Sequence, residues 1–166
     1  MKRVIQLCTI SIFLLLTSTM THAANWEKID STHKADWFFD TDSIRYELKR
    51  DDLTNQDVPD TTKITYWEKA VIPDKALEDA KKNAHKTHKI LATKYRLRII
   101  TLSLSNRTAT VHESIQYTPY WIILFHDTKE SSERIVPGTR REKMYNVIRE
   151  YARTHHDQLI KNTYGN

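Results

Sequence analysis

The stretch Tyr95–Tyr117, YRLRIITLSLSNRTATVHESIQY, decides the fold. Its apolar residues occupy alternate positions as far as Ile99, and from Ile100 onward they occupy the other set of positions. A β-bulge produces such a change of phase, because one extra residue moves the following side chains to the other face of a strand. We therefore predict two antiparallel strands joined at Asn106-Arg107, with a bulge at Ile99-Ile100 opposite Glu113.

The predicted register places the apolar residues of this hairpin on one buried face. Arg96 and Arg98 then point to solvent, and with Lys94 they form a basic stripe that suits nucleic acid or anionic glycans. An exposed strand face is the simpler interpretation, since nucleic-acid binding also needs exposed aromatic side chains among the basic residues. The expected pairs are Leu104 with Ala109, Leu102 with Val111, Leu97 with Ile115 and Tyr95 with Tyr117.

Composition predicts further strands on both sides of this hairpin. Aromatic and β-branched residues favour extended structure at residues 25–30, 36–40 and 62–72, and Trp121–Phe125, WIILF, is expected to form a buried strand. The segment Lys49–Thr61 is polar and contains Pro59, which predicts a loop.

Two segments predict helices. Lys75–His88 follows Asp74, a good N-cap residue, and its thin apolar stripe indicates a peripheral helix. Thr139 and Glu142 form a capping box at the start of a second helix, whose apolar stripe continues as far as Ile160. Strands linked by hairpins and a helix with one apolar stripe indicate an α+β fold. We expect a small antiparallel β-sheet packed against a C-terminal α-helix, with the other helix at the periphery.

The first 23 residues have the composition of a secretory signal peptide. Lys2 and Arg3 precede an apolar run, and the small residue Ala23 ends the segment. The apolar run is too short for a comfortable membrane span. Removing 23 of the 166 residues leaves 143 residues, which we interpret as a single exported domain, residues 24–166. Its expected location is the periplasm, the cell surface or the extracellular medium.

Composition also argues against several classes of function. Cys8 is the only cysteine and leaves with the signal peptide, so the mature chain has no disulfide and no cysteine nucleophile. Gly138 and Gly165 are the only glycines, so the chain holds neither a P-loop nor a dinucleotide-binding fingerprint. The formal net charge falls from +5 to +3 when Lys2 and Arg3 are removed, which gives little attraction for nucleic acid. We expect neither an enzyme nor a cofactor.

A series of short motifs occurs in a characteristic order over most of residues 25–152. The motifs are Phe39–Ile44 (FDTDSI), Tyr66–Lys69 (YWEK) and Ile135–Thr139 (IVPGT), followed by Glu142 and Tyr145. In these motifs and their order the chain resembles the surface-adhesin protein E-like domains of bacterial secreted proteins. The resemblance implies a small antiparallel sheet packed against a C-terminal helix, a location at the cell surface or in the periplasm, and binding of a host protein, as in the best-known member.

The chain also departs from the pattern of this family. Members often carry one cysteine in the hairpin strand and another in the last helix, and this chain has neither. Glu133-Arg134 stands where a tryptophan is usual, and residues 51–59 look like an insertion. The motifs that match look structural, so the resemblance supplies no binding residue.

Histidine pairs offer an alternative function. His85 and His88 lie three residues apart on a predicted helix, and His112 or His126 could supply a third zinc ligand. A zinc-binding or zinc-dependent hydrolytic protein is therefore one alternative, although the segment lacks the glutamate of an HExxH site. Solvated surface histidines are the simpler interpretation, also for His155-His156.

Three acidic residues have structural interpretations. Asp40 and Asp42 are expected to accept hydrogen bonds from backbone amides in a turn, in place of acting as a catalytic carboxylate pair or a calcium site. Glu113 is expected toward the core side of the hairpin, at its rim, where it would pair with an arginine.

Together these features indicate an exported, non-enzymatic, adhesin-like binding protein whose ligand is unknown. The expected partner is a host or envelope surface protein or a glycan, and not nucleic acid. A structural component of the cell envelope is a second alternative, which the sequence does not separate from a binding protein.

We predict cleavage after Ala23, so that the exported chain begins Ala24-Asn25-Trp26. Protein expressed with its own signal and recovered after export should have the intact mass of residues 24–166. A mass that includes Met1, or an acyl adduct on Cys8, would contradict this prediction.

Overall fold

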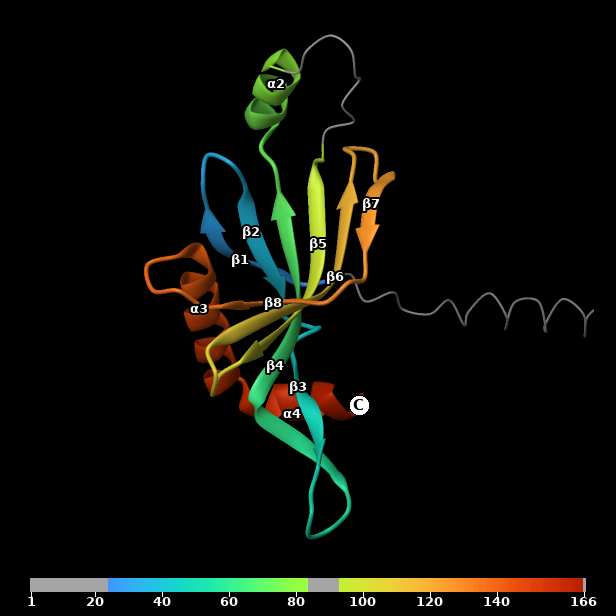
Figure 1. Cartoon of the computed structure of the whole chain (residues 1–166), viewed down its shortest axis with the longest axis vertical. Helices are drawn as coiled ribbons and strands as arrows, with labels where there is room; N and C mark the ends of the chain where they lie inside the picture. The colour runs from blue at the N-terminus through green and yellow to red at the C-terminus, as the bar shows by residue number, and fades with distance from the viewer. Residues whose placement is uncertain (1–23, 84–92, 166) are drawn as a thin grey trace, which may run out of the picture.

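The computed structural model describes residues 24–83 and 93–165. The strands form one antiparallel sheet in the order β1-β2-β4-β5-β6-β7, with β3 paired to β4 and β8 paired to β6 (Figure 1). The fold is α+β, as predicted, and its sheet has eight strands. The strands are β1 (Trp26–Ser31), β2 (Asp36–Asp40), β3 (Arg45–Arg50), β4 (Asp57–Val71), β5 (Tyr95–Ser103), β6 (Thr108–Tyr117), β7 (Ile123–Asp127) and β8 (Ser131–Arg134); the helices are α2 (Asp74–Asn83), α3 (Arg140–Thr154) and α4 (His156–Tyr164).

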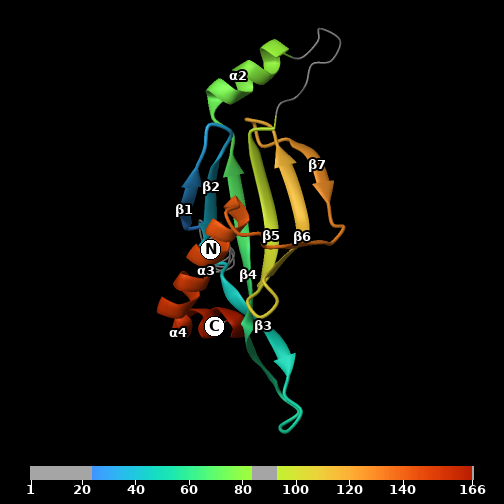
Figure 2. The same ribbon diagram turned by 60° about the vertical axis from the view of Figure 1, so that its left-hand side comes forward.

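The two C-terminal helices pack against one face of the sheet. We call this the helix face; its core side chains include Tyr66, Ile100 and Leu102, which α3 covers with Met144 and Ile148. The opposite side is the back face. α4 lies beside β3, where Asn162 Nδ2 donates a hydrogen bond to the carbonyl oxygen of Ile44 (2.9 Å). α2 lies beyond the upper ends of the strands, as Figures 1 and 2 both show, which agrees with the predicted peripheral helix.

Several predicted elements are confirmed. The strands expected at residues 25–30, 36–40 and 62–72 correspond to β1, β2 and the second part of β4. The proposed signal peptide and the last part of the predicted helix at 75–88 lie outside the described residues. In the part of the chain that the structure describes, no helix is both long and apolar enough to cross a membrane.

The β5–β6 hairpin contains a bulge where it is predicted, but the extra residue lies on the other strand. Beyond the bulge, Leu97 pairs with Ile115 and the rest of the predicted register is confirmed. On the turn side, Leu102 pairs with Ala109, two residues away from the predicted register. The extra residue is His112 on β6, and the turn spans residues 104–107. A shift of two residues leaves every side chain on its own face, so the apolar alternation cannot detect it.

This arrangement reverses the predicted orientation of Arg96 and Arg98. Against β4, β5 keeps one register from Tyr95 to Ser103, so its side chains alternate without interruption. Arg98 therefore shares the helix face with Ile100 and lies opposite Glu68. The prediction of a solvent-facing arginine pair is wrong, because the bulge belongs to β6 and changes the phase of β6 alone.

The predicted loop at Lys49–Thr61 is also wrong. β3 and the first part of β4 form a two-stranded hairpin that projects past the rest of the sheet (Figure 2). Pro59 pairs with Leu48 in this hairpin. The first part of β4 has a partner strand on one side only, so the missing N–H of a proline is tolerated there.

The predicted helix starts are confirmed in one case and corrected in the other. The Thr139 hydroxyl accepts a hydrogen bond from the Glu142 N–H (3.3 Å), and the Glu142 carboxylate accepts one from the Gly138 N–H (2.8 Å). Gly138 has φ +76°, which favours glycine. In α2, the Pro73 carbonyl accepts from Leu77 (3.1 Å), so Asp74 is the first helical residue and not the N-cap.

The C-terminal helix is interrupted, whereas the sequence predicts one continuous helix to Ile160. His155 has φ −120° and ψ 33°, which ends α3 at Thr154, and α4 begins at His156. The apolar stripe nevertheless continues into the core, because Leu159 of α4 is fully buried.

We predict that Ile148→Ala destabilises the fold by about 2–5 kcal/mol, because Ile148 is fully buried between α3 and the sheet. Lys161→Ala is the matched control on the exposed side of α4 and should unfold at the wild-type urea concentration. Equal urea midpoints for the two variants would show that α3 does not pack on the sheet.

Candidate functional site

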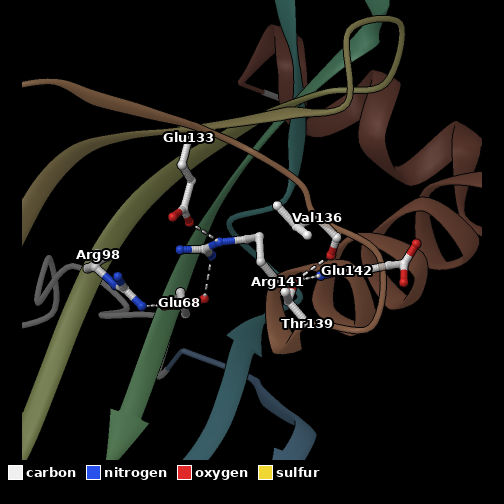
Figure 3. Close-up of polar contacts among 7 residues, drawn as sticks. All are labelled: Glu68, Arg98, Glu133, Val136, Thr139, Arg141 and Glu142. Atoms are coloured by element: carbon white, nitrogen blue, oxygen red, sulfur yellow. Dashed lines mark hydrogen bonds and ion pairs between the residues drawn. The ribbon is translucent and has the colours of Figure 1, made fainter.

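A buried carboxylate lies at the centre of the helix face. Glu68 on β4 is 0% exposed, and two guanidinium groups pair with it (Figure 3). Arg98 on β5 binds one carboxylate oxygen, and Arg141 of α3 binds the other at 3.1 Å. Arg141 also binds Glu133 of β8 through its Nε (2.7 Å). Two carboxylates thus connect β4, β5, β8 and α3.

The start of α3 holds Arg141 in place. Thr139 caps the helix, and its hydroxyl donates a hydrogen bond to the carbonyl oxygen of Val136 (2.6 Å), which ties the cap to the preceding loop (Figure 3). Burial alone would lower the pKa of Arg141, but Glu68 and then Glu133 outweigh it, and the pKa lies above its usual value. Arg141 is therefore charged and fixed.

The alternation of side chains along β4 is a sequence signal for this buried carboxylate. Glu68 occupies the same set of alternate positions on β4 as Ile64, Tyr66 and Ala70, so its side chain points to the apolar face of that strand. A charged residue in such a position is buried at a high free-energy cost unless oppositely charged groups pair with it. The prediction that Arg98 faces solvent hid its partner.

A second feature is an exposed apolar surface around β7. The prediction of a buried strand at Trp121–Phe125 is wrong, because β7 is the last strand of the sheet and pairs with β6 alone. We call the exposed side chains before and within this strand the β7 patch; they range from 50% exposed at Phe125 to 84% at Tyr120. The patch consists of Tyr120, Trp121, Ile122, Ile123 and Phe125.

The loop that carries the first part of the β7 patch is held firmly. Thr118 is buried, and its hydroxyl oxygen accepts hydrogen bonds from the N–H groups of Tyr120 (3.2 Å) and Ile122 (3.1 Å). Trp121 adopts φ +60°, which is costly for a bulky residue. Its ring stacks on Tyr95 of the back face, with 4.2 Å between ring centroids. These contacts fix apolar side chains in exposed positions.

The remaining sequence candidates are placed in separate surroundings. His112 bonds with Thr101 (2.8 Å) and Glu130 (2.7 Å). Glu113 lies opposite Ile99 on the back face and pairs with His126 (2.7 Å), so the predictions that it faces the core and pairs with an arginine are wrong.

The prediction of an aspartate turn is confirmed for Asp40. The Asp40 carboxylate accepts hydrogen bonds from the N–H groups of Asn25 (3.0 Å) and Asp42 (3.2 Å). Burial, and to a smaller extent the charge of Asp42, raise the pKa of Asp40 above its usual value. Asp42 is exposed, and it contributes its N–H group to the turn in place of its carboxylate.

The histidines do not come together in the described part of the chain. His156 bonds with the Tyr46 hydroxyl (2.9 Å), and the His155 ring stacks on Tyr151. Among residues 24–83 and 93–165, no group of three or more His, Cys, Asp or Glu side chains could hold a metal ion. His85 and His88, on which the zinc alternative depends, lie outside these residues.

Comparisons with known proteins give a distant likeness of fold. No protein-family model and no curated protein matches the chain. Two solved structures of protein E from Haemophilus influenzae resemble it. The structure in crystal form II has a TM-score of 0.41 and 10% sequence identity, and the match covers 77% of this chain and 94% of the protein E chain. The other structure has a TM-score of 0.39 and 9% sequence identity, and the match covers 81% of this chain and 95% of the protein E chain. Likenesses at this level carry no argument about a ligand, and membership of the family suggested by the motifs stays a prediction.

Proposed function

We propose that the chain is an exported, non-enzymatic binding protein that takes an extended segment of a partner protein as an additional strand along β7. The observation that carries this proposal is the β7 patch: five neighbouring, exposed apolar side chains on and beside an edge strand. Export rests on the signal-peptide pattern of residues 1–23.

The apolar part of the proposal follows from the composition of ordinary protein surfaces. Single exposed apolar residues are common, but a contiguous apolar patch marks an interaction surface. Large aromatic side chains such as Tyr120, Trp121 and Phe125 are also the residue types enriched in the cores of protein interfaces. Because Thr118 and the Tyr95 stack already hold the loop, binding would cost little ordering entropy.

The strand part of the proposal follows from the backbone. β7 pairs with β6 on one side, so the N–H and C=O groups of its other side have no partner strand in the described sheet. An extended peptide satisfies such groups by adding a strand, and its alternate side chains contact the side chains of the edge strand. Such a segment would meet Phe125 on the helix face and Ile123 on the back face, because the register between β6 and β7 shifts by one residue at this point.

We predict that Phe125→Lys weakens binding of extended peptides about 30-fold, the ratio that corresponds to ~2 kcal/mol at an interface hot spot. Peptides would be selected on the purified mature chain from a displayed random library, and their dissociation constants would then be measured for each variant. Leu53→Lys is the matched control, because Leu53 is an exposed apolar residue, 96% exposed, in the β3–β4 turn, far along the chain from β7.

Selected peptides that bind Phe125→Lys as tightly as the wild-type chain would overturn the proposal. A concentration-dependent dimer in analytical ultracentrifugation that Phe125→Lys abolishes would also overturn it, because the occupant of the β7 edge would then be a second copy of this chain.

A further inference from the structure

The helix face carries more positive charge than its carboxylates neutralise. Four arginines lie around Glu68, and two further carboxylates on this face, Glu133 and Asp30, pair with Arg141 and Lys143. Arg98 and Arg141 account for the ion pairs with Glu68 and Glu133. The other two arginines, Arg96 on β5 and Arg140 at the start of α3, have no hydrogen-bonded or ion-paired partner among the described residues. The negative charge of Glu68 favours the charged form of both but forms no ion pair with either.

The unsatisfied donors of the described residues fall in this same cluster. Buried side-chain atoms without a hydrogen-bond partner are the Nε atoms of Arg96 and Arg98, an Nη atom of Arg140 and the Tyr66 hydroxyl. Tyr66 is 1% exposed. It lies two residues before Glu68 on β4, so the two side chains are neighbours on the helix face. Buried donors are normally paired, since an unpaired one costs roughly 1–3 kcal/mol and more when it is charged. The three arginine donors are therefore available to hydrogen-bond an acceptor group of a ligand.

The arginines are held in position by an aromatic ring. The Arg140 guanidinium stacks on Trp37 of β2, with its central carbon 3.4 Å from the ring centroid, and Arg98 lies 5.6 Å from the same centroid. In the sheet, Trp37 pairs with Ala70, and Ala70 pairs with Arg96. Paired residues of an antiparallel sheet point to the same face, so Trp37 and Arg96 flank the small side chain of Ala70 on the helix face.

The electrostatic state of the cluster agrees with this geometry. Burial lowers the pKa values of Arg96 and Arg140 below their usual values. The negative charge of Glu68 opposes this effect at both residues, and the positive charge of Arg98 adds to it. Burial and the negative charge of Glu68 raise the pKa of Tyr66, so its hydroxyl stays protonated and can donate a hydrogen bond. A negative charge beside these arginines would relieve their mutual repulsion.

We propose that Arg96, Arg98 and Arg140, beside Trp37 and Ala70, form a binding site for an oxyanion: a carboxylate, sulfate or phosphate group of a ligand. Guanidinium groups present planar, paired donors that match the oxygens of these anions, and they bind them with short, charge-assisted hydrogen bonds. The Nε of Arg98 remains available, because the pair with Glu68 uses its Nη2. Arg96 lies two strands from β7, on the face that also carries Phe125, and the inference does not rest on the proposed function.

Equilibrium dialysis of the purified mature chain with radiolabelled sulfate, phosphate and acetate, at constant ionic strength in sodium chloride, tests the site. We expect one molar equivalent of at least one of these anions to bind, and the anion that binds most tightly identifies the group. Arg96→Gln and Arg140→Gln should each weaken that binding at least tenfold. Arg45→Gln, an exposed arginine on β3, is the matched control and should bind as the wild-type chain does.

A measurement of folding separates a binding role from a structural one. Without anion, Arg96→Gln should unfold at the same or a higher urea concentration than the wild-type chain, because it removes a charge that neighbouring arginines repel. A lower midpoint would show that Arg96 stabilises the fold and would overturn the proposal. Binding of none of the three anions above the chloride background, or equal loss in Arg45→Gln, would overturn it as well.

Discussion

The buried carboxylate of Glu68 is the constraint on which the arrangement of this protein depends. A charge removed from water must be paired, and Glu68 has one guanidinium on each oxygen, from Arg98 of β5 and from Arg141 of α3. The pairing therefore fixes the first turn of α3 against two central strands of the sheet. The capping box of Thr139 and Glu142 then directs the helix along the core, where Met144 and Ile148 exclude water from the same face.

The same constraint concentrates positive charge. Placing Glu68 at the centre of the sheet requires guanidinium groups nearby, and the chain supplies two more than the carboxylates pair. Trp37 supports one of them, Arg140, by stacking with its guanidinium group. The β7 patch lies at the edge of the sheet, two strands from Arg96. One sheet thus carries a cluster of arginines on its helix face and exposed apolar side chains at its β7 edge.

Much of the fold was predictable because it depends on local pattern. The alternation in residues 95–117 gave the strands and the position of the bulge, and the T-x-x-E motif gave the start of α3. The strand that carries the bulge was not predictable, since moving the extra residue from β5 to β6 leaves the register beyond it unchanged. That single choice decides whether Arg98 faces solvent or Glu68, so the error hid the charged cluster. The exposure of Trp121–Phe125 depends on β7 being the last strand, which composition does not reveal.

A double-mutant cycle between Glu68 and Arg141 tests the central claim most directly. The free energy of unfolding would be measured with urea for the wild-type chain, Glu68→Gln, Arg141→Gln and the double variant, with the exposed pair Glu150 and Arg153 as a control cycle. If the buried carboxylate fixes α3 to the sheet, each single variant costs about 3–5 kcal/mol. The double variant then costs less than the sum by about 1–3 kcal/mol. Additivity within about 0.5 kcal/mol would contradict the account.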